Sequence, residues 1–476
     1  MAAVKPNKTR VDISGVVSEE KQSKLDAVLR PITLTDDILQ KMMSAFREQM
    51  QLASSPDENV RKKSDHLMMN TFVRELLDGT EQGDFLGLDL GGTNFRVVLV
   101  RFKNGQAETI TQYYTLTDEC LSGPSAGVFD FIAESIQDFL QKQGLEKSGQ
   151  KIPLGFTFSF PSTQLALNKS ILLTWTKTFK CPDGVGEDPV AMLEAAIERR
   201  AKGLPVDIVV VMSDTVSTLM AGNYLDKKCR LGLILGTGCN AAFVENISDI
   251  EKWTGDLKDP KHVIVNVELG STGDGGCLDF CRSEYEKEVD KYSNHPQSFT
   301  FEKSFAGMYL GELVRLVLVR LVKDGVLFGG DGGQLMEARW KFTTSHVTAI
   351  ESDEGSSTAG TRGVLKKFDL EARATEEDVA IIRKVAEFIS QRGAHIIGAA
   401  MSVLVNYVRL PEVTIGIDGS LYEKHPKFHD FMMEIFDKYC PNTKVTMILA
   451  KDGSGQGAAF AAVSALRQLE KGIRCA

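Results

Sequence analysis

The chain has 476 residues, of which 43% are apolar and 25% are charged, and its formal net charge is −9. Its length exceeds what one hydrophobic core normally supports, so two or three domains are expected. The acidic balance gives no electrostatic footprint for nucleic acid, and no apolar run is long enough to predict a membrane span. We therefore expect neither a nucleic-acid nor a membrane partner.

The N-terminal sequence has no apolar core after a basic start, so we expect no secretory signal and a cytoplasmic location. The eight cysteines are scattered without paired spacing and are interpreted as reduced thiols, and the seven histidines show no metal-binding pattern. Residues 1–30 are polar and weakly patterned, which predicts an N-terminal tail.

Helical signals begin at Thr35, a helix N-cap followed by an apolar stripe that ends at Met50. A second helix is predicted over residues 59–77. Residues 85–90 and 95–100 predict a hairpin, residues 109–117 a third strand, and residues 126–143 a helix. These elements form a first α/β unit.

The hairpin turn Gly91-Gly92-Thr93-Asn94 predicts a phosphate site, because glycines let backbone N–H groups approach an anion. Asp89, at the end of the first strand, would repel that anion unless a cation lies between them. A magnesium ion held through water and phosphate oxygens meets that need. The alternative is an ordinary hairpin with no ligand.

Asp214 follows the apolar strand 206–212 and precedes a helix predicted over residues 216–224. Open α/β sheets place catalytic groups at such strand ends, so Asp214 is a candidate catalytic carboxylate. The alternative is a purely structural N-cap.

The sequence LGLILGTGCN at residues 231–240 repeats LGLDLGGTN at residues 86–94. The repeat predicts two related halves, each with a phosphate-binding turn, that face one another across a cleft. Neither a GxxxxGK[ST] loop nor the signatures of protein kinases are present.

The second half has further predicted strands at residues 262–267, 413–417 and 445–449, and helices at 282–292, 301–322, 377–398 and 458–470. The last two strands end in the glycine-containing segments DGS and KDGSGQG. Such strand ends are where the phosphates and ribose of a nucleotide could bind.

Eight motifs appear in an order that resembles the ATP-dependent hexokinase family from about residue 33 onward. They are GTEQGDFLGLDLGGTNFRV, LGFTFSFP, WTKTFK, SDTVSTL, LGTGCNA, GMYLGELVR, IGIDGSLYEKHP and GSGQGAA. The resemblance implies the duplicated actin-like ATPase (ribonuclease H-like) fold, an α/β class with two domains around a cleft. It assigns residues 73–217 and 453–476 to a small domain, and residues 31–72 and 218–452 to a large one.

By the same resemblance, the chain transfers the γ-phosphoryl group of Mg-ATP to the 6-hydroxyl of a hexose such as glucose, with hexose and ATP as partners and a monomer as the expected state. Asp214 would be the general base and Lys177 a second catalytic group. The implied sugar-binding residues are Ser159, Thr176, Lys177, Ser213, Asp214, Asn240, Glu268 and Glu302. The implied nucleotide-binding residues are Asp89, Leu90, Gly91, Gly92, Thr93, Asn94, Arg96, Thr237, Thr344, Gly419, Ser420 and Ser454, with Asp89 toward Mg²⁺ through water.

The chain departs from the family pattern at the sugar site. Ser213 stands where the family usually has Asn, and Thr178 replaces the usual Gly after the Thr-Lys pair. The family segment Glu-Trp-Gly-Ala-Phe-Gly-Asp reads ELGSTGD at residues 268–274, which loses two aromatic side chains. We therefore expect a looser loop there, and a weakened or altered sugar affinity.

Two other functions stay open on sequence. One is a hexokinase-like sensor that binds sugar and nucleotide with little or no turnover, favoured by Ser213 and the altered loop. The other is an actin- or chaperone-like ATPase of the same fold, which the sugar-site residues Ser159, Lys177 and Glu302 disfavour.

Overall fold

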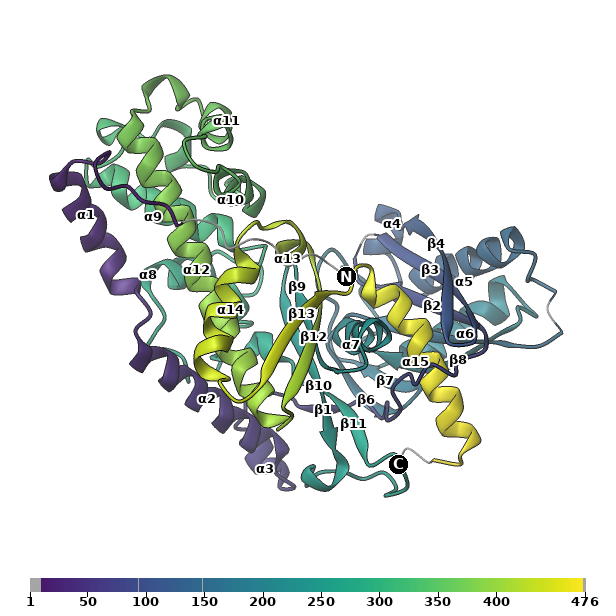
Figure 1. Cartoon of the computed structure of the whole chain (residues 1–476). Helices are drawn as coiled ribbons and strands as arrows, with labels where there is room; N and C mark the ends of the chain where they lie inside the picture. The colour runs from purple at the N-terminus through teal and green to yellow at the C-terminus, as the bar shows by residue number, and fades with distance from the viewer. Residues whose placement is uncertain (1–9, 93, 148, 474–476) are drawn as a thin grey trace.

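The computed structural model describes residues 10–92, 94–147 and 149–473. These residues form two α/β halves, each built on its own sheet: a mainly blue half in Figure 1, and a half in which purple N-terminal helices join teal, green and yellow segments. The predicted α/β class is confirmed by this topology.

The first sheet contains β4 (Gln106–Thr115), β3 (Asn94–Lys103), β2 (Gly83–Leu90), β5 (Ile152–Phe158) and β8 (Val206–Met212), in that order. β2 pairs antiparallel with β3, and β3 with β4, while β2, β5 and β8 run parallel. The predicted hairpin and third strand are confirmed.

The second sheet contains β1 (Met69–Asn70), β11 (His262–Asn266), β10 (Cys239–Asn246), β9 (Cys229–Leu235), β12 (Glu412–Asp418) and β13 (Lys444–Leu449), in that order. β9, β10 and β11 form an antiparallel meander, and β9, β12 and β13 run parallel. This is the order and orientation of the first sheet with β1 added at one edge. The duplication predicted from two short motifs therefore extends over five strands of each half.

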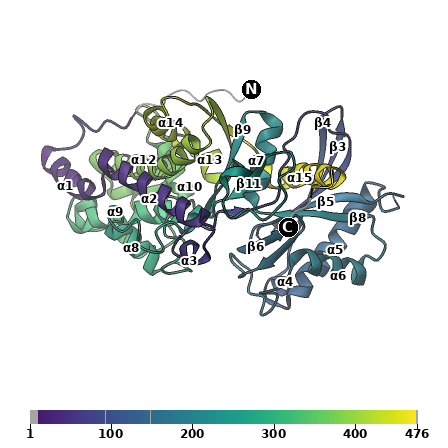
Figure 2. The same ribbon diagram turned by 90° about the horizontal axis from the view of Figure 1, so that it is seen from below.

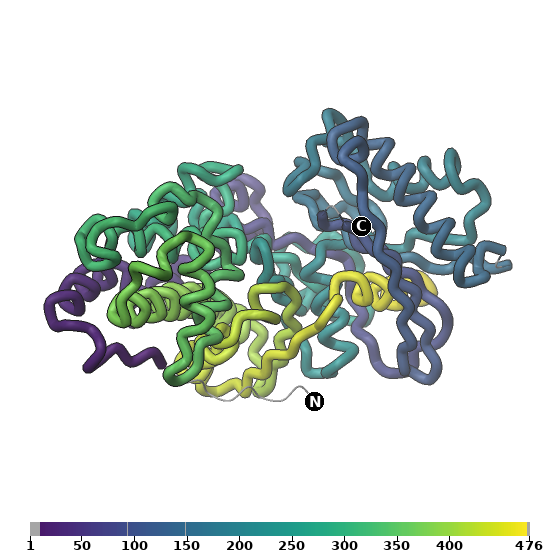
Figure 3. The backbone as a smooth tube through the Cα atoms, turned by 90° about the horizontal axis from the view of Figure 1, so that it is seen from above, coloured from purple at the N-terminus to yellow at the C-terminus, as the bar shows by residue number. Residues whose placement is uncertain are grey.

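A helix follows the last strand of each repeat and packs on the sheet of the other half. α15 (Gly453–Glu470) packs on β2 and β5, whereas α7 (Asp214–Leu225) packs on β9 and β12. Glycines permit this contact: a Cβ on Gly155 would lie 1.9 Å from the carbonyl oxygen of Ala458, and one on Gly232 would lie 2.4 Å from that of Thr215. α7 and α15 also pack against each other, and Figure 3 shows the yellow C-terminal helix reaching the blue half.

The outer face of the first sheet is covered by α5 (Ser125–Lys142) and α6 (Pro189–Arg200), opposite α15 (Figure 2). Near them lie the short helix α4 (Asp118–Ser122) and a ribbon of β6 (Ser162–Ala166) and β7 (Lys169–Leu172). Phenylalanines and branched aliphatic side chains between α5, α6 and the sheet form a core of their own.

A helical layer covers the second sheet, with α12 at its centre. Its helices are α1 (Glu19–Leu29), α2 (Asp36–Ser54), α3 (Glu58–Arg61), α8 (Glu284–Lys291), α9 (Leu310–Lys323), α10 (Thr344–Glu351), α11 (Ala359–Lys367), α12 (Glu376–Tyr407), α13 (Ser420–Lys424) and α14 (Phe428–Tyr439). α12 contacts α2, α9 and α14. It is long and apolar enough to cross a membrane, but 83% of its most apolar window is buried inside the fold, as in the core helix of a globular protein.

Three sequence predictions need correction. The part of the 1–30 tail that is described is folded, since α1 occupies Glu19–Leu29 and buries Leu25, Val28 and Leu29. The helix predicted at 59–77 is confined to α3, because the chain continues as β1 and pairs with β11. The helix predicted at 301–322 begins only at Leu310.

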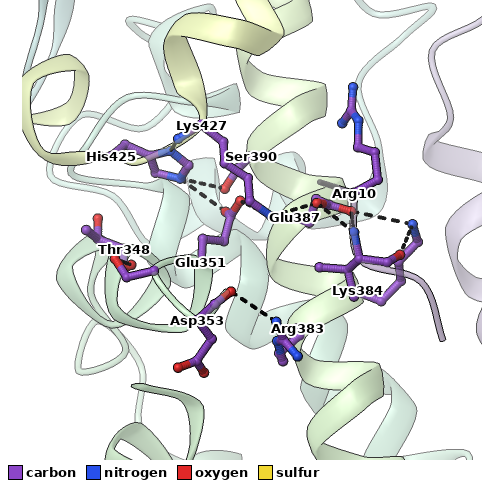
Figure 4. Close-up of polar contacts among 12 residues, drawn as sticks. Arg10, Thr348, Glu351, Asp353, Arg383, Lys384, Glu387, Ser390, His425 and Lys427 are labelled. Atoms are coloured by element: carbon purple, nitrogen blue, oxygen red, sulfur yellow. Dashed lines mark hydrogen bonds and ion pairs between the residues drawn. The ribbon is translucent and has the colours of Figure 1, made fainter. Parts of the chain in front are cut away.

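The N-terminal segment is fixed to the helical layer by buried charges (Figure 4). The Val11 N–H donates to both carboxylate oxygens of Glu387, at 3.1 and 2.9 Å, and Lys384 donates to the Val11 carbonyl at 3.1 Å. Glu387 also pairs with buried Lys427 at 2.7 Å. A backbone amide held by a charged acceptor is a strong hydrogen bond, which explains why this polar segment is ordered.

The predicted division into small and large domains places the first sheet in the small domain and the second in the large one. Its boundary at residues 217 and 218 falls inside α7. The exact boundaries stay a prediction.

Candidate active site

The turn after β2 is where the two halves meet around Asp89. Asp89 accepts hydrogen bonds from Arg96 Nε at 2.9 Å and from the Ser454 hydroxyl at 2.8 Å, both on Oδ2. Arg96 also donates to Asp452 at 2.6 Å and to Ser454. Three predicted nucleotide-binding residues, Asp89, Arg96 and Ser454, are thus brought together. Asp452 was not predicted to belong with them.

Asp418 is a second carboxylate at this place that the sequence analysis missed. It ends β12 and accepts a 3.4 Å hydrogen bond from the Ser454 N–H. Burial raises the pKa of Asp418 to about 6, although the positive charge of Arg96 acts in the opposite direction. Its position at a strand end directly before Gly419 was the signal that could have identified it.

The oxygen ligands that Asp89 offers fit a magnesium ion that is held mainly by nucleotide phosphates. Among the described residues, none hydrogen-bonds Oδ1 of Asp89, and none of their acidic, His and Cys side chains form a cluster of three or more that could hold a metal. Mg²⁺ usually keeps several waters and takes only one or two protein carboxylates together with substrate phosphates. Asp89 is suited to that role.

Asp214 is the first residue of α7 and follows the N-cap Ser213, one residue after the end of β8, which is the strand-to-helix position predicted for it. Burial raises the pKa of the Asp214 carboxyl and the charge of Asp89 raises it further, whereas the positive charge of Lys177 lowers it. Ser159 also favours the charged form. A carboxylate between a lysine and a second acid is a candidate proton acceptor, because its pKa responds to both neighbours.

Lys177 and Ser159 lie beside the Gly91 turn. Lys177 Nζ donates to the Ser159 carbonyl at 3.1 Å, and a Cβ on Gly91 would lie 3.5 Å from both Lys177 Nζ and Ser159 Oγ. The Ser159 hydroxyl oxygen is buried and, among the described residues, has no partner of standard hydrogen-bond geometry, although it lowers the pKa of Asp214 as a hydrogen-bond donor would. Lys177 has a left-handed backbone with φ 61°, which is costly for a lysine and typical of functional sites. An unpaired buried hydroxyl beside a lysine is suited to bind a polar ligand.

Glu268 is held by two asparagine amides. Its Oε1 accepts from Asn266 Nδ2 at 2.6 Å and from Asn240 Nδ2 at 3.1 Å. Burial raises the pKa of Glu268, the two amides lower it, and the charge of Asp214 raises it, which places the two acids within electrostatic reach. Glu268 also has left-handed backbone angles, φ 58° and ψ 50°.

Asn266 is the residue of this site that sequence reasoning missed. Its Oδ1 accepts from Asn240 at 3.0 Å and from the Thr215 hydroxyl at 3.2 Å, so it connects Glu268 to the first turn of α7. It lies two residues before Glu268 at the end of β11. A polar residue that ends an apolar strand occupies the edge where α/β sheets place functional groups, and this was the available signal.

Glu302 lies beside the second glycine turn. We call Glu302, Glu268, Asn240 and Ser159 the polar wall. Its Oε2 accepts the Cys239 N–H at 3.0 Å, and a Cβ on Gly238 would lie only 2.7 Å from that oxygen. Burial raises the pKa of Glu302 to about 7, and the negative charge of Glu268 contributes in the same direction. Glycine at residue 238 is therefore what lets the carboxylate approach the turn.

The remaining predicted site residues lie near these groups, and their ligand roles stay predictions. The Ser213 hydroxyl bonds to Thr215 at 2.7 Å, Asn94 accepts from Thr115 at 2.8 Å, and Thr344 donates to the Gly307 carbonyl at 2.7 Å. The Leu90 carbonyl accepts from the Ser159 N–H at 3.1 Å, and Gly236 in the second turn packs against Gly419. Thr237 and Ser420 are exposed, Gly92 and Thr176 are partly exposed, and Thr93 lies outside the described residues.

Comparison with known proteins identifies the family of the chain. Two family models, both described as hexokinase, match residues 24–224 and 230–464. Human Hexokinase-1 is 38% identical over 454 residues, which is 93% of this chain and 48% of that protein, and human Hexokinase-2 is 41% identical over 416 residues, 86% of this chain and 44% of that protein. The chain spans about half the length of these curated relatives.

A solved structure matches over nearly the whole chain. A hexokinase from Schistosoma mansoni complexed with glucose has 35% sequence identity and a TM-score of 0.84, and the match covers 94% of this chain and 99% of that one. A second hexokinase crystal structure, at 24% identity and a TM-score of 0.80, shows the same fold. The two family models and the near-full-length match to a hexokinase structure show that the chain belongs to the hexokinase family.

Proposed function

We propose that the chain is an ATP-dependent hexokinase that transfers the γ-phosphoryl group of ATP to the 6-hydroxyl of a hexose, glucose being the first candidate. The observation that carries the proposal is the location of Asp214. Thr215, the next residue, donates to Asn266, which binds Glu268, and the charges of Lys177 and Asp89 act on the Asp214 carboxyl, so this carboxyl lies between the sugar residues and the phosphate turn. Membership of the hexokinase family supports the same reaction.

The polar wall matches the hydrogen-bonding needs of a sugar. Each sugar hydroxyl presents a donor and an acceptor, and buried groups without partners are costly. Glu268 and Glu302 supply acceptors, Asn240 supplies both kinds of group, and the buried Ser159 hydroxyl has no standard hydrogen-bond partner in the described part of the chain. These residues would orient the hexose so that one hydroxyl faces Asp214.

Asp214 is proposed as the general base. A primary alcohol must lose its proton as its oxygen attacks the γ-phosphorus, and the Asp214 carboxylate would accept that proton. Burial raises its pKa above that of an exposed carboxyl, which makes it a better acceptor, while the charge of Lys177 keeps the ionised form accessible.

The phosphate side would be organised by the two turns and by Lys177. The Gly91-Gly92 turn and the turn at residues 236–238 present backbone N–H groups, and Lys177 Nζ lies beside Gly91, where positive charge offsets the charge of phosphoryl oxygens. Asp89 would hold Mg²⁺ through water. When bound, the ion neutralises the charge that gathers on the phosphates.

The sensor alternative is not favoured, because each of the proposed charged groups of the site is present and the comparisons are with hexokinases. We further propose that the enzyme is cytosolic. The cysteines of the described part of the chain are all free thiols, which supports a reducing compartment.

The test is a coupled assay of the purified full chain with ATP, Mg²⁺ and a panel of hexoses. The proposal expects ATP-dependent sugar phosphate that requires Asp214. Measurable glucose binding with no sugar phosphate at saturating glucose would instead support the sensor. ATP hydrolysis that is independent of sugar would contradict both.

A further inference from the structure

The loop that follows Glu268 is bound to a distant segment of the chain by hydrogen bonds of Ser271 and Thr272, two residues that depart from the family pattern. We call residues 268–277 the sugar loop. Within it, Ser271 and Thr272 stand where the family pattern has Ala and Phe, and both hydroxyls are used. Ser271 Oγ donates to the Asp65 carbonyl at 2.6 Å, and Thr272 Oγ1 lies 2.7 Å from His66 Nε2. The expectation of a looser loop is therefore not what the contacts indicate.

The Asp65 carboxylate binds the backbone of the same loop. Its Oδ2 accepts from the Gly273 N–H and its Oδ1 from the Gly275 N–H, both at 2.8 Å. A Cβ on Gly275 would lie 2.8 Å from Oδ1, so only glycine allows this approach. Asp65 is itself anchored, because its N–H donates to the Gln49 side chain on α2 at 2.7 Å. The loop is thus connected to the helical layer by charge-assisted bonds.

The tautomer of His66 follows from the proton count at Thr272. The Thr272 hydroxyl has one proton, and its 2.7 Å bond to the Leu269 carbonyl uses it. Thr272 must then accept the proton of His66 Nε2, which leaves Nδ1 as the bare nitrogen. Nδ1 is indeed buried with no hydrogen-bond partner among the residues that the structure describes, and burial lowers the pKa of His66 to about 3. His66 is therefore a neutral donor with a fixed orientation.

The sugar loop also forms hydrogen bonds with the segment just before Glu302. Asp274 in the sugar loop accepts from the Phe299 N–H at 3.0 Å and the Thr300 N–H at 2.8 Å, just before Glu302. The Phe46 ring packs edge-on against His66 at 4.4 Å and lies 6.2 Å from the Phe301 ring. Glu268 and Glu302, the two glutamates of the polar wall, thus depend on one set of contacts.

We propose that Asp65 and His66 are positioning residues for the sugar: they hold the sugar loop so that Glu268, and through Asp274 also Glu302, present their carboxylates to the hexose. This inference rests on the proposed hexokinase function. It explains how Glu268 keeps left-handed backbone angles, which a glutamate adopts only when its surroundings enforce them. It also assigns a purpose to the hydroxyls at residues 271 and 272, which form directed bonds where the family pattern has Ala and Phe.

The experiment is a double-mutant cycle on the full chain with Thr272→Val, His66→Phe and both together, and with Asp65→Asn as a separate variant. Valine keeps the shape of threonine without its hydroxyl, and phenylalanine keeps the ring contact with Phe46. Ser390→Ala is the matched control, since Ser390 is a buried hydroxyl bonded to another buried histidine, His425, at 3.1 Å and lies far from the sugar loop in sequence (Figure 4). The readouts are glucose affinity by calorimetry, the KM for ATP, and hydrogen exchange of the peptide at 269–277.

Each single variant is expected to weaken glucose binding by about five- to tenfold, the effect of about one lost hydrogen bond, and to leave the KM for ATP unchanged. The Thr272→Val/His66→Phe double variant should be no weaker than either single one, because the bond is already lost. Exchange at 269–277 should accelerate in each of them and not in Ser390→Ala.

Additive losses in the double variant, equal losses in glucose and ATP affinity, or unchanged exchange at 269–277 would overturn the proposal. So would a Ser390→Ala control that loses glucose affinity as strongly as Thr272→Val. If the unmodified chain binds no glucose, the proposed function fails, and the exchange measurement alone decides whether Asp65 and His66 fix the loop.

Discussion

The Ser454 hydroxyl donates a 2.8 Å hydrogen bond to the Asp89 carboxylate across 365 positions of sequence. Arg96 binds both residues, so the first glycine turn and the start of the last helix form one unit. In the proposed chemistry this unit serves the nucleotide, whereas the sugar loop serves the hexose. Substitutions in the two places should therefore have separable effects.

Asp214→Asn should lower kcat by about 10²–10⁴-fold, the usual contribution of a general base, with glucose affinity largely kept because the amide has a similar shape. The measurement is steady-state kinetics together with glucose calorimetry. A variant that retained more than a tenth of the parent kcat would exclude Asp214 as the base.

The rate should also fall in mild acid, because the base must be ionised and burial raises the pKa of Asp214. The pKa that governs the acidic side of the kcat–pH profile is therefore expected to lie above that of an ordinary carboxyl group. The kcat should rise as pH increases through this pKa. The residual rate of Asp214→Asn should lack this rise.

Ser454→Ala should raise the KM for ATP and leave glucose affinity unchanged, since Ser454 orients Asp89 and Arg96 and contacts no sugar residue. Losing one such hydrogen bond costs about 1 kcal/mol, which is about fivefold in affinity. A glucose-specific defect would show that the unit serves the sugar side instead.

Glucose affinity should depend on pH through Glu302. Its pKa is raised to about 7, and a sugar hydroxyl donates more strongly to a carboxylate than to a neutral acid. Affinity is therefore expected to rise as pH increases through about 7 and to level off above it. Glu302→Gln should bind more weakly and lose this dependence, which calorimetry between pH 6 and about 8 would reveal.

Acid should destabilise the fold through His66. Its pKa falls from 6.5 to about 3 on burial, so the unfolded chain binds the extra proton across this window. Stability contributed by neutral His66 is present above pH 6.5 and is lost progressively as pH falls toward about 3. Chemical unfolding of His66→Phe at several pH values should show a shallower decline than the parent, while identical slopes would contradict the assignment.

Ser213→Asn tests the departure next to Asp214. The Ser213 hydroxyl forms a 2.7 Å hydrogen bond with the Thr215 hydroxyl. Part of its capacity to hydrogen-bond a sugar is therefore already used. An amide at this position would add a donor pair, and glucose affinity should rise by about five- to 150-fold, the equivalent of about 1–3 kcal/mol. Unchanged affinity would show that Ser213 does not limit sugar binding.

The sequence by itself determined the elements whose signals are local. The hairpin around Gly91, its repeat at 231–240 and the strand that ends before Asp214 were all found from short apolar runs and the turn or helix-start residues that follow them. Short-range patterns also placed the helix N-cap at Thr35. Because backbone conformation there depends on neighbours a few residues away, one chain segment contains the information.

Only the tertiary structure decided which distant segments meet. Asp452 reaches Arg96, and Asp65 and His66 reach the sugar loop 206 to 210 positions later, through packing of helices and sheets that no local pattern encodes. The misplaced helix at 59–77 failed for the same reason, since pairing of β1 with β11 overrides local preference. Hydrogen bonds between distant residues follow from the packed fold, and so the anchoring of Glu268 became visible only there.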